Sequence, residues 1–129
     1  MARPNRPALT RDAVLEAAVG LADRDGLAAL SMRSLARHLG VEAMSLYHHV
    51  AGKEALLDAM VDEVFGEMHL PVAGGDWRAE LRERSVTGRA VLLRHRWAVG
   101  LMDSRRSPAP GTCDIMTPFW VALRRRVSR

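Results

Sequence analysis

Gly40 lies between two short amphipathic segments, and this arrangement constrains the fold more than any other feature of the sequence. Apolar residues recur at helical spacing within residues 32–39, and helical spacing resumes over residues 43–50. Glycine adopts positive φ at little steric cost, so it can end one helix and lead the chain directly into the next. Two short helices joined across such a turn form a helix-turn-helix motif.

Periodic segments on both sides of this motif predict two more helices. Thr10 offers an N-cap oxygen for a first helix that Gly26 ends, and Ser31 offers one for the second helix. A further helix is expected from Lys53 to a point before Pro71, because apolar residues recur there with acidic residues on the other face. The core residues expected for the first two helices are Val14, Leu15, Ala18, Leu21, Ala22, Met32, Leu35, Ala36 and Leu39.

Residues 71–75 are rich in proline and glycine, which predicts a boundary between two domains. Asp76 is the expected N-cap of a fifth helix, and the apolar stretch 97–102 begins a sixth. We therefore expect an all-α chain in three parts. These are a basic flexible arm at residues 1–9, a three-helix helix-turn-helix domain with a linking fourth helix over residues 10–70, and a short, incomplete helical domain over residues 76–129.

Charge is distributed unevenly along the chain. Residues 1–53 hold seven basic and five acidic groups, residues 54–80 hold one and seven, and residues 81–129 hold eleven and three. A net charge of +4 and a pI near 10.5 favour association with polyanions, although many proteins that never act on DNA share this property. Cys113 is the only cysteine, so no internal disulfide is possible. No apolar run approaches the roughly 18 residues of a membrane span, and we expect a cytoplasmic protein.

The third helix of this arrangement carries side chains suited to the major groove of B-DNA. Ser45 can bond base edges or phosphate, and Tyr47 and His49 can donate to phosphate oxygens. Ala43 and Met44 can make apolar contact with a thymine methyl group. Tyr47 has an alternative role as a half-buried ring that braces this helix, and the two roles are compatible.

Basic side chains flank that helix. Lys53 can place its ammonium group and the first amides of the fourth helix against a phosphate, and Arg33 points toward the same DNA backbone. The candidate DNA-binding residues are Arg33, Ala43, Met44, Ser45, Tyr47, His48, His49 and Lys53.

Residues 9–69 resemble the DNA-binding domain of the TetR family. The resemblance rests on the pattern Leu30-Ser31-Met32-Arg33, Leu35-Ala36, Leu39-Gly40-Val41 and Leu46-Tyr47-His48-His49-Val50, followed by Lys53 and Leu56-Leu57. It implies that the eight candidate residues lie at or near DNA, and that a helix over residues 53–69 links the reading head to a sensor domain. The stretches GDWRAEL and LLRHRWAV look like the subgroup whose sensor domain is related to that of the tetracycline repressor.

The resemblance also implies a function. It predicts a homodimeric, sequence-specific repressor that binds a palindromic double-stranded DNA operator. A small-molecule effector in the sensor domain would tilt the fourth helix and change the distance between the two heads. Residues 76–129 are shorter than the sensor domain of the family, so we expect a truncated ligand-binding and dimerisation domain.

Other classes of function find less support. A truncated interaction module that pairs with an intact relative is the alternative prediction. We expect no enzyme and no cofactor, because the sequence has no glycine-rich phosphate loop, nucleophile elbow or paired carboxylates with a plausible base. We also expect no metal site, since the adjacent His48 and His49 point about 100° apart on a helix. His38, His69 and His95 are expected at the surface.

Residues 113–129 form an unusual tail, with an irregular apolar face that Pro118 interrupts. Arginine outnumbers lysine eighteen to one, which suggests GC-rich coding. A frameshift near Thr112 is therefore one hypothesis for this tail, and it explains the arginines at 124–126 better than a nucleic-acid-binding segment does.

Overall fold

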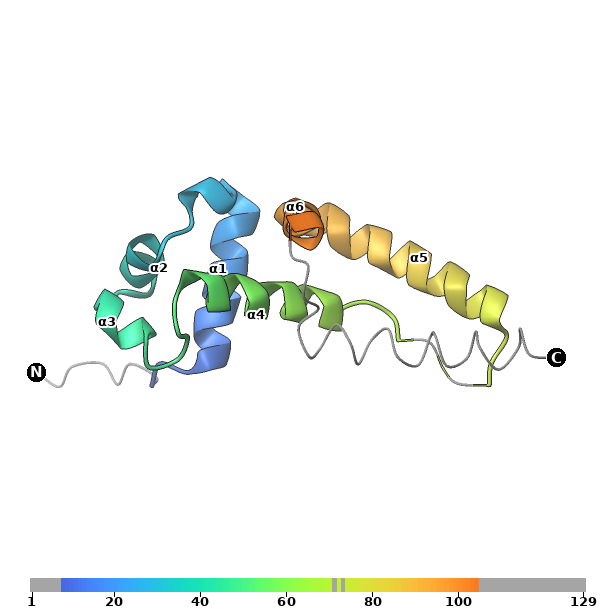
Figure 1. The fold of residues 1–129 in the computed structure, drawn as a ribbon, viewed down its shortest axis with the longest axis horizontal. Coiled ribbons are helices and arrows are strands. Elements are labelled where there is room, and N and C mark those ends of the chain that lie inside the picture. Colours follow the sequence, from blue (N-terminus) through green and yellow to red (C-terminus); the bar gives the residue numbers. More distant parts are fainter. Residues whose placement is uncertain (1–7, 71, 73, 105–129) are drawn as a thin grey trace, which may run out of the picture. The chain divides into compact units, whose positions relative to one another are not determined.

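The computed structural model describes residues 8–70, 72 and 74–104 (Figure 1). Its helices are α1 (Arg11–Asp25), the 3₁₀ helix η1 (Leu27–Ala29), α2 (Met32–Leu39), α3 (Ala43–Leu46), α4 (Lys53–Gly66), α5 (Trp77–Arg94) and α6 (Arg96–Ser104). These described residues include no strand, so the predicted all-α fold is confirmed. The predictions for residues 1–7 of the arm and for the tail at 113–129 lie outside the described residues.

Side-chain caps begin three of the helices, at residues that the sequence predicts. Thr10 Oγ1 accepts a hydrogen bond from the amide three residues later (3.1 Å), and Asp76 accepts one from the amide two residues later (3.2 Å). Ser31 and Ser34 cap α2 reciprocally, since each hydroxyl oxygen accepts from the amide of the other residue at 3.0 and 2.8 Å. These bonds satisfy amides that have no partner within their helix.

The chain forms two compact units, Met1–Leu56 and Leu57–Arg129. In the first unit α2 packs against α1 and against α3. The five core residues predicted for α1 are buried, as are Leu35 and Ala36 of α2, whereas Met32 and Leu39 are half-buried. The division between the units falls within α4, and the domain boundary expected at residues 71–75 stays a prediction.

The second unit has its own apolar cluster. Val61, Val64 and Phe65 come from the later turns of α4, and Met68 follows them. α5 and α6 pack against each other. The remaining members of the cluster are the buried Val91 and Ala98, with the half-buried Leu92, Trp97 and Leu101 packed against it.

Hydrogen bonds tie the segment after α4 to α5. The carboxylate Oε2 of Glu80 lies 2.7 Å from Nε2 of His69 and accepts from the amide of Val72 at 3.1 Å. These two bonds, that from His69 first, lower the pKa of Glu80. Two further bonds join His69 to α5, because Arg84 Nη1 donates to its carbonyl oxygen (3.1 Å) and its amide donates to Thr87 Oγ1 (3.3 Å).

The expected surface position of His95 is wrong. His95 is 7% exposed and lies between α5 and α6, where its amide donates to the carbonyl of Val91 at 3.0 Å. Its Nε2 is 3.3 Å from Oε1 of Glu67, and its ring meets that of Trp97 edge-on with the centroids 6.1 Å apart. A carboxylate and an aromatic ring therefore lie beside the buried imidazole of His95.

No helix among residues 8–70, 72 and 74–104 is long and apolar enough to cross a membrane. Within the same residues, no group of three or more His, Cys, Asp or Glu side chains could hold a metal ion.

Candidate nucleic-acid interface

The turn between α2 and α3 is closed by hydrogen bonds to the last carbonyls of α2. Gly40 adopts a left-handed conformation (φ 67°, ψ 35°), and its amide donates to the carbonyl of Arg37 at 3.2 Å. The amide of Val41 reaches back to the carbonyl of Ala36 at 3.0 Å. This pair of bonds is the Schellman arrangement, which ends a helix and redirects the chain within two residues. The glycine turn that the sequence predicts is therefore present.

α3 is shorter than predicted. Helical spacing predicts residues 43–50, but the α-helix spans Ala43–Leu46 and a hydrogen-bonded turn completes the segment. The amide of Tyr47 donates to Met44 at 3.2 Å, one residue closer than in an α-helix, so the last turn is tightened. The amides of His49 and Val50 both donate to the carbonyl of Leu46, at 2.9 and 3.0 Å.

Apolar side chains anchor one face of this segment. Leu46 is fully buried and Val50 is 6% exposed, and they lie on the side of α3 that faces the interior. Ala36 is 4% exposed on α2, and its small side chain allows close packing of α2 and α3. Replacing a buried leucine such as Leu46 with alanine typically costs about 2–5 kcal/mol, so these contacts fix the orientation of α3.

The opposite face of α3 is open to solvent. Met44 is 73% exposed and Tyr47 is 47% exposed, and His48 is exposed as well. Ala43, Ser45 and His49 are half-buried. The Met44 side chain is unbranched and apolar, and at this exposure its packing within the chain contributes little to stability. The exposure of Tyr47 leaves room for both predicted roles, since half of its surface is covered by the protein.

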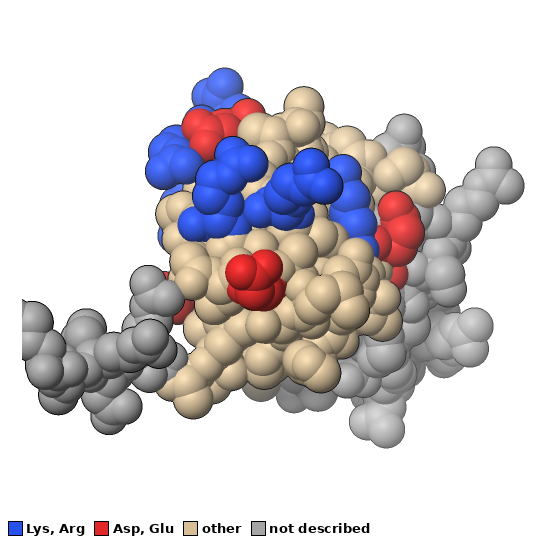
Figure 2. All heavy atoms as spheres, turned by 90° about the vertical axis from the view of Figure 1, so that its left-hand side faces the viewer, with Lys and Arg blue, Asp and Glu red and all other residues tan. Residues whose placement is uncertain are grey.

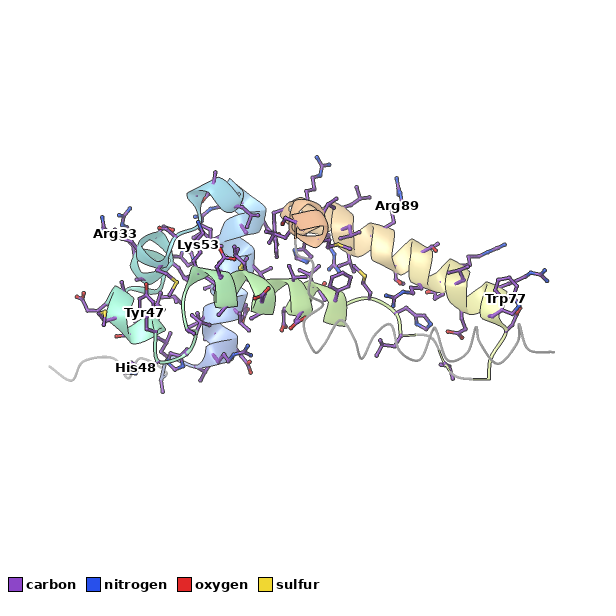
Figure 3. The ribbon with its side chains drawn as sticks, viewed as in Figure 1. Arg33, Tyr47, His48, Lys53, Trp77 and Arg89 are labelled. Carbon is purple, nitrogen blue, oxygen red and sulfur yellow. The ribbon has the colours of Figure 1, made fainter. Side chains whose placement is uncertain are left out.

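Two basic residues border α3 from neighbouring helices. Arg33 lies in the first turn of α2 and Lys53 begins α4, and both are exposed. Figure 3 shows Arg33, Tyr47, His48 and Lys53 in the part of the first unit formed by α2, α3 and the start of α4. Every predicted site residue therefore belongs to one compact unit, Met1–Leu56.

Two exposed charged residues of this region were not among the predicted site residues. Arg37 is exposed one turn after Arg33, and the spacing of four places both arginines on the same side of α2. That spacing is a signal that sequence analysis could have used. Glu42, which precedes α3, is also exposed and makes no side-chain cap.

Basic side chains gather on this side of the molecule. Figure 2 faces the side of Figure 1 that carries α2 and α3, and it shows Lys and Arg in a band with neutral surface below it and an acidic group near the middle. A short exposed helix bordered by cations has the width and charge to enter a major groove while basic groups contact phosphates. The fold and the site together define a helix-turn-helix protein.

Comparison with known proteins agrees with this class. Residues 14–60 match the family of bacterial regulatory proteins named the tetR family. The transcriptional repressor DrrR1 of Streptomyces coeruleorubidus is 42% identical over 127 residues, which are 95% of this chain and 47% of the repressor.

Two solved structures have the same fold. ActR of Streptomyces coelicolor in complex with actinorhodin aligns with a TM-score of 0.83 at 32% identity, over 93% of this chain and 57% of that one. BioQ bound to its natural double-stranded DNA operator aligns with a TM-score of 0.75 at 30% identity, over 91% of this chain and 70% of that one.

The chain belongs to the TetR family of bacterial regulatory proteins, which is a family of regulators and not of enzymes. It spans less than half the length of the curated relatives DrrR1 and a transcriptional regulator of Saccharopolyspora erythraea. Membership in this family therefore fixes the class of protein to which the chain belongs.

Proposed function

We propose that this chain is a sequence-specific DNA-binding transcriptional regulator that acts as a repressor. The observation that carries the proposal is the outward face of α3, on which Met44 and Tyr47 are exposed while Leu46 holds the helix from the other side. The operator complex of BioQ and the repressor DrrR1 support it, since both are similar to this chain.

Each site residue has a role in this proposal that follows from its chemistry. Met44 and Ala43 would contact thymine methyl groups, and Ser45 would bond a base edge. Tyr47, His48 and His49 would donate to phosphate oxygens. The cations Arg33 and Lys53 would contact phosphates on either side of the groove, which positions α3 without selecting sequence.

The proposal extends to the arrangement of the operator. Two copies would bind a palindrome, with one reading head in each half-site about one helical turn apart. Residues 10–70 would then form the reading domain, and the helices that follow residue 76 would belong to the sensing and pairing domain. Exposed apolar side chains of α5 and α6 outside the groove described below favour pairing, and they include Val86 and Met102.

Relief of repression by a small molecule completes the proposal. The structure of ActR with actinorhodin supports ligand binding in a similar fold. α4 starts in the unit that carries the site residues and continues into the second unit, so it is the element through which a ligand could alter the reading head. A ligand changes DNA affinity only by the difference in its own affinity for the two states of the protein.

Selection from random DNA tests the DNA-binding role. The full chain is incubated with a pool of duplexes that carry a randomised 30-base-pair segment, and bound duplexes are amplified and sequenced through several rounds. We expect one enriched motif with inverted symmetry. If the pool stayed random while the chain still bound DNA, the chain would be binding DNA only as a general polyanion, and this result would contradict sequence-specific recognition.

Light scattering coupled to size exclusion separates the proposal from its alternative, an interaction module that pairs with an intact relative. A dimer that shifts the selected duplex supports an autonomous regulator. A monomer that enriches no motif and shifts no duplex would favour the interaction module.

A further inference from the structure

A groove of about 670 Å³ lies in the second unit, lined by residues of α5, α6 and the segment after α4. Its apolar lining includes Leu81 and Leu92 of α5, Val99 of α6 and Met68. Small-molecule sites in proteins typically have about 300–1,000 Å³ and mainly apolar walls. The groove therefore has the size and lining of a site for a small organic molecule.

One residue that lines this groove is a glycine of α5. Gly88 is buried in α5, and a Cβ added there would meet Sδ of Met68 at 3.6 Å. A larger side chain at this position would project into the groove, which Gly88 lines. The lack of a side chain at Gly88 thus contributes to the volume of the groove.

All the charged side chains among the described residues that line the groove are positively charged. Arg84, Arg89 and Arg96 line the groove, and no acidic residue is among its described lining residues. Arg89 and Arg96 are exposed and form no ion pair with another described residue. Figure 3 shows Arg89 projecting outward from α5, and this residue is one of those that line the groove. Apolar walls with cations beside them are complementary to an apolar molecule that carries a negative charge.

We propose that this groove binds a small apolar molecule bearing an anionic oxygen group, such as a carboxylate or sulfonate. The apolar part would lie against Leu92, Val99 and Met68, and the anionic group would pair with Arg89 and Arg96. This inference rests on the proposed function in one respect, because it gives the chemical class of the effector.

Arg84 connects the groove to the end of α4. Its Nη1 donates to the carbonyl oxygen of His69 at 3.1 Å, while its side chain also lines the groove. His69 follows α4 closely and is further tied to α5 through Glu80 and Thr87. An anion that draws Arg84 toward itself competes with this carbonyl, so binding in the groove changes the restraint on the residues after α4.

A pair of dyes tests the anionic class directly in the full chain. The sulfonate 1-anilinonaphthalene-8-sulfonate and the neutral N-phenyl-1-naphthylamine share an aromatic body and differ in charge. We expect the sulfonate to bind about tenfold more tightly at low salt, which is the effect of one or two charge-assisted bonds. The variant Arg89→Gln/Arg96→Gln should lower the affinity for the sulfonate to that for the neutral dye. The control Arg82→Gln removes an exposed arginine of α5 outside the groove and should change neither affinity.

A second variant locates the dye. Ser85→Phe places a ring in the groove from an exposed position, so it should weaken both dyes while the cooperative thermal transition is retained. Equal affinities of the two dyes, or no effect of Arg89→Gln/Arg96→Gln, would overturn the anionic class. Light scattering measures self-association on the same samples. If dye binding falls as the chain self-associates, a second copy covers the groove, and this result would also overturn the proposal. DNA binding is measured on the same samples, so failure of the reading head is seen separately.

Discussion

The amide of Val41 donates to the carbonyl oxygen of Ala36 at 3.0 Å, and this bond spans the left-handed residue between α2 and α3. The bond ends α2 and begins the approach to α3 within a few residues. The direction in which α3 presents Met44 and Tyr47 therefore depends on the backbone conformation of Gly40.

Gly40→Ala should destabilise the chain by about 1–2 kcal/mol, because a Cβ is unfavourable at φ 67°. Urea unfolding followed by circular dichroism measures the change. Gly20→Ala is the matched control, since Gly20 lies inside α1 with nothing within 4 Å of its added Cβ. The control should raise stability by about 0.5–1 kcal/mol. Equal effects of the two substitutions would contradict the role given to the turn.

Ser31→Ala should lower stability by about 1 kcal/mol, because Ser31 Oγ accepts from the amide of Ser34 at 3.0 Å. Ser31→Thr retains the capping oxygen and should lose much less. The same unfolding experiment compares both variants with the original chain. If alanine and threonine were equivalent, the cap would contribute nothing to α2.

Much of the fold was predictable because its signals are local. The caps at Thr10, Ser31 and Asp76 act within three residues, and Gly40 turns the chain at its own position. The early end of α3 was not predictable in this way. No glycine or proline stands between Leu46 and Ala51, and the helix ends through a tightened hydrogen bond at Tyr47.

In the second unit, contacts between residues that are far apart in the sequence could not be predicted from the sequence. His95 is buried beside Glu67, which lies 28 residues earlier, and periodicity does not encode that pairing. The contact between Arg84 and the carbonyl of His69 is of the same kind. At the candidate interface, in contrast, the eight residues share one short stretch, and Arg37 could have been added from its spacing to Arg33.

Arg33→Gln should reduce the salt dependence of DNA binding, because one fewer phosphate contact releases one fewer counterion. The slope of log K against log salt concentration should fall in magnitude by about one. Arg24→Gln also removes one positive charge, but Arg24 pairs with Asp25 at 3.0 Å near the end of α1. Its slope should match that of the original chain. Identical slopes for all three proteins would remove Arg33 from the interface.

Glu80→Gln should destabilise the chain near neutral pH and lose this effect in acid. The pKa of Glu80 is lowered in the folded state, so its carboxylate stabilises the fold above the ordinary pKa of 4.5. That contribution disappears as the pH falls through the lowered pKa. Urea unfolding from pH 7 to pH 3 should show the difference between variant and original narrowing below about pH 4.5. Glu83→Gln, an exposed neighbour on α5, is the control. A difference that stays constant with pH would contradict the bond to His69.

The affinity of Tyr47 variants for the selected duplex tests the central claim most directly, which is that the outward face of α3 contacts DNA. Fluorescence anisotropy compares the original chain, Tyr47→Ala and Tyr47→Phe on the selected duplex and on a scrambled duplex of equal composition. Tyr47→Phe keeps the ring and removes the hydroxyl group, while thermal melts check that all three fold. We predict that Tyr47→Ala weakens binding to the selected duplex about tenfold while it retains a cooperative melt, and that the affinity of Tyr47→Phe lies between those of Tyr47→Ala and the original chain. Unchanged affinity of a folded Tyr47→Ala variant would contradict the claim.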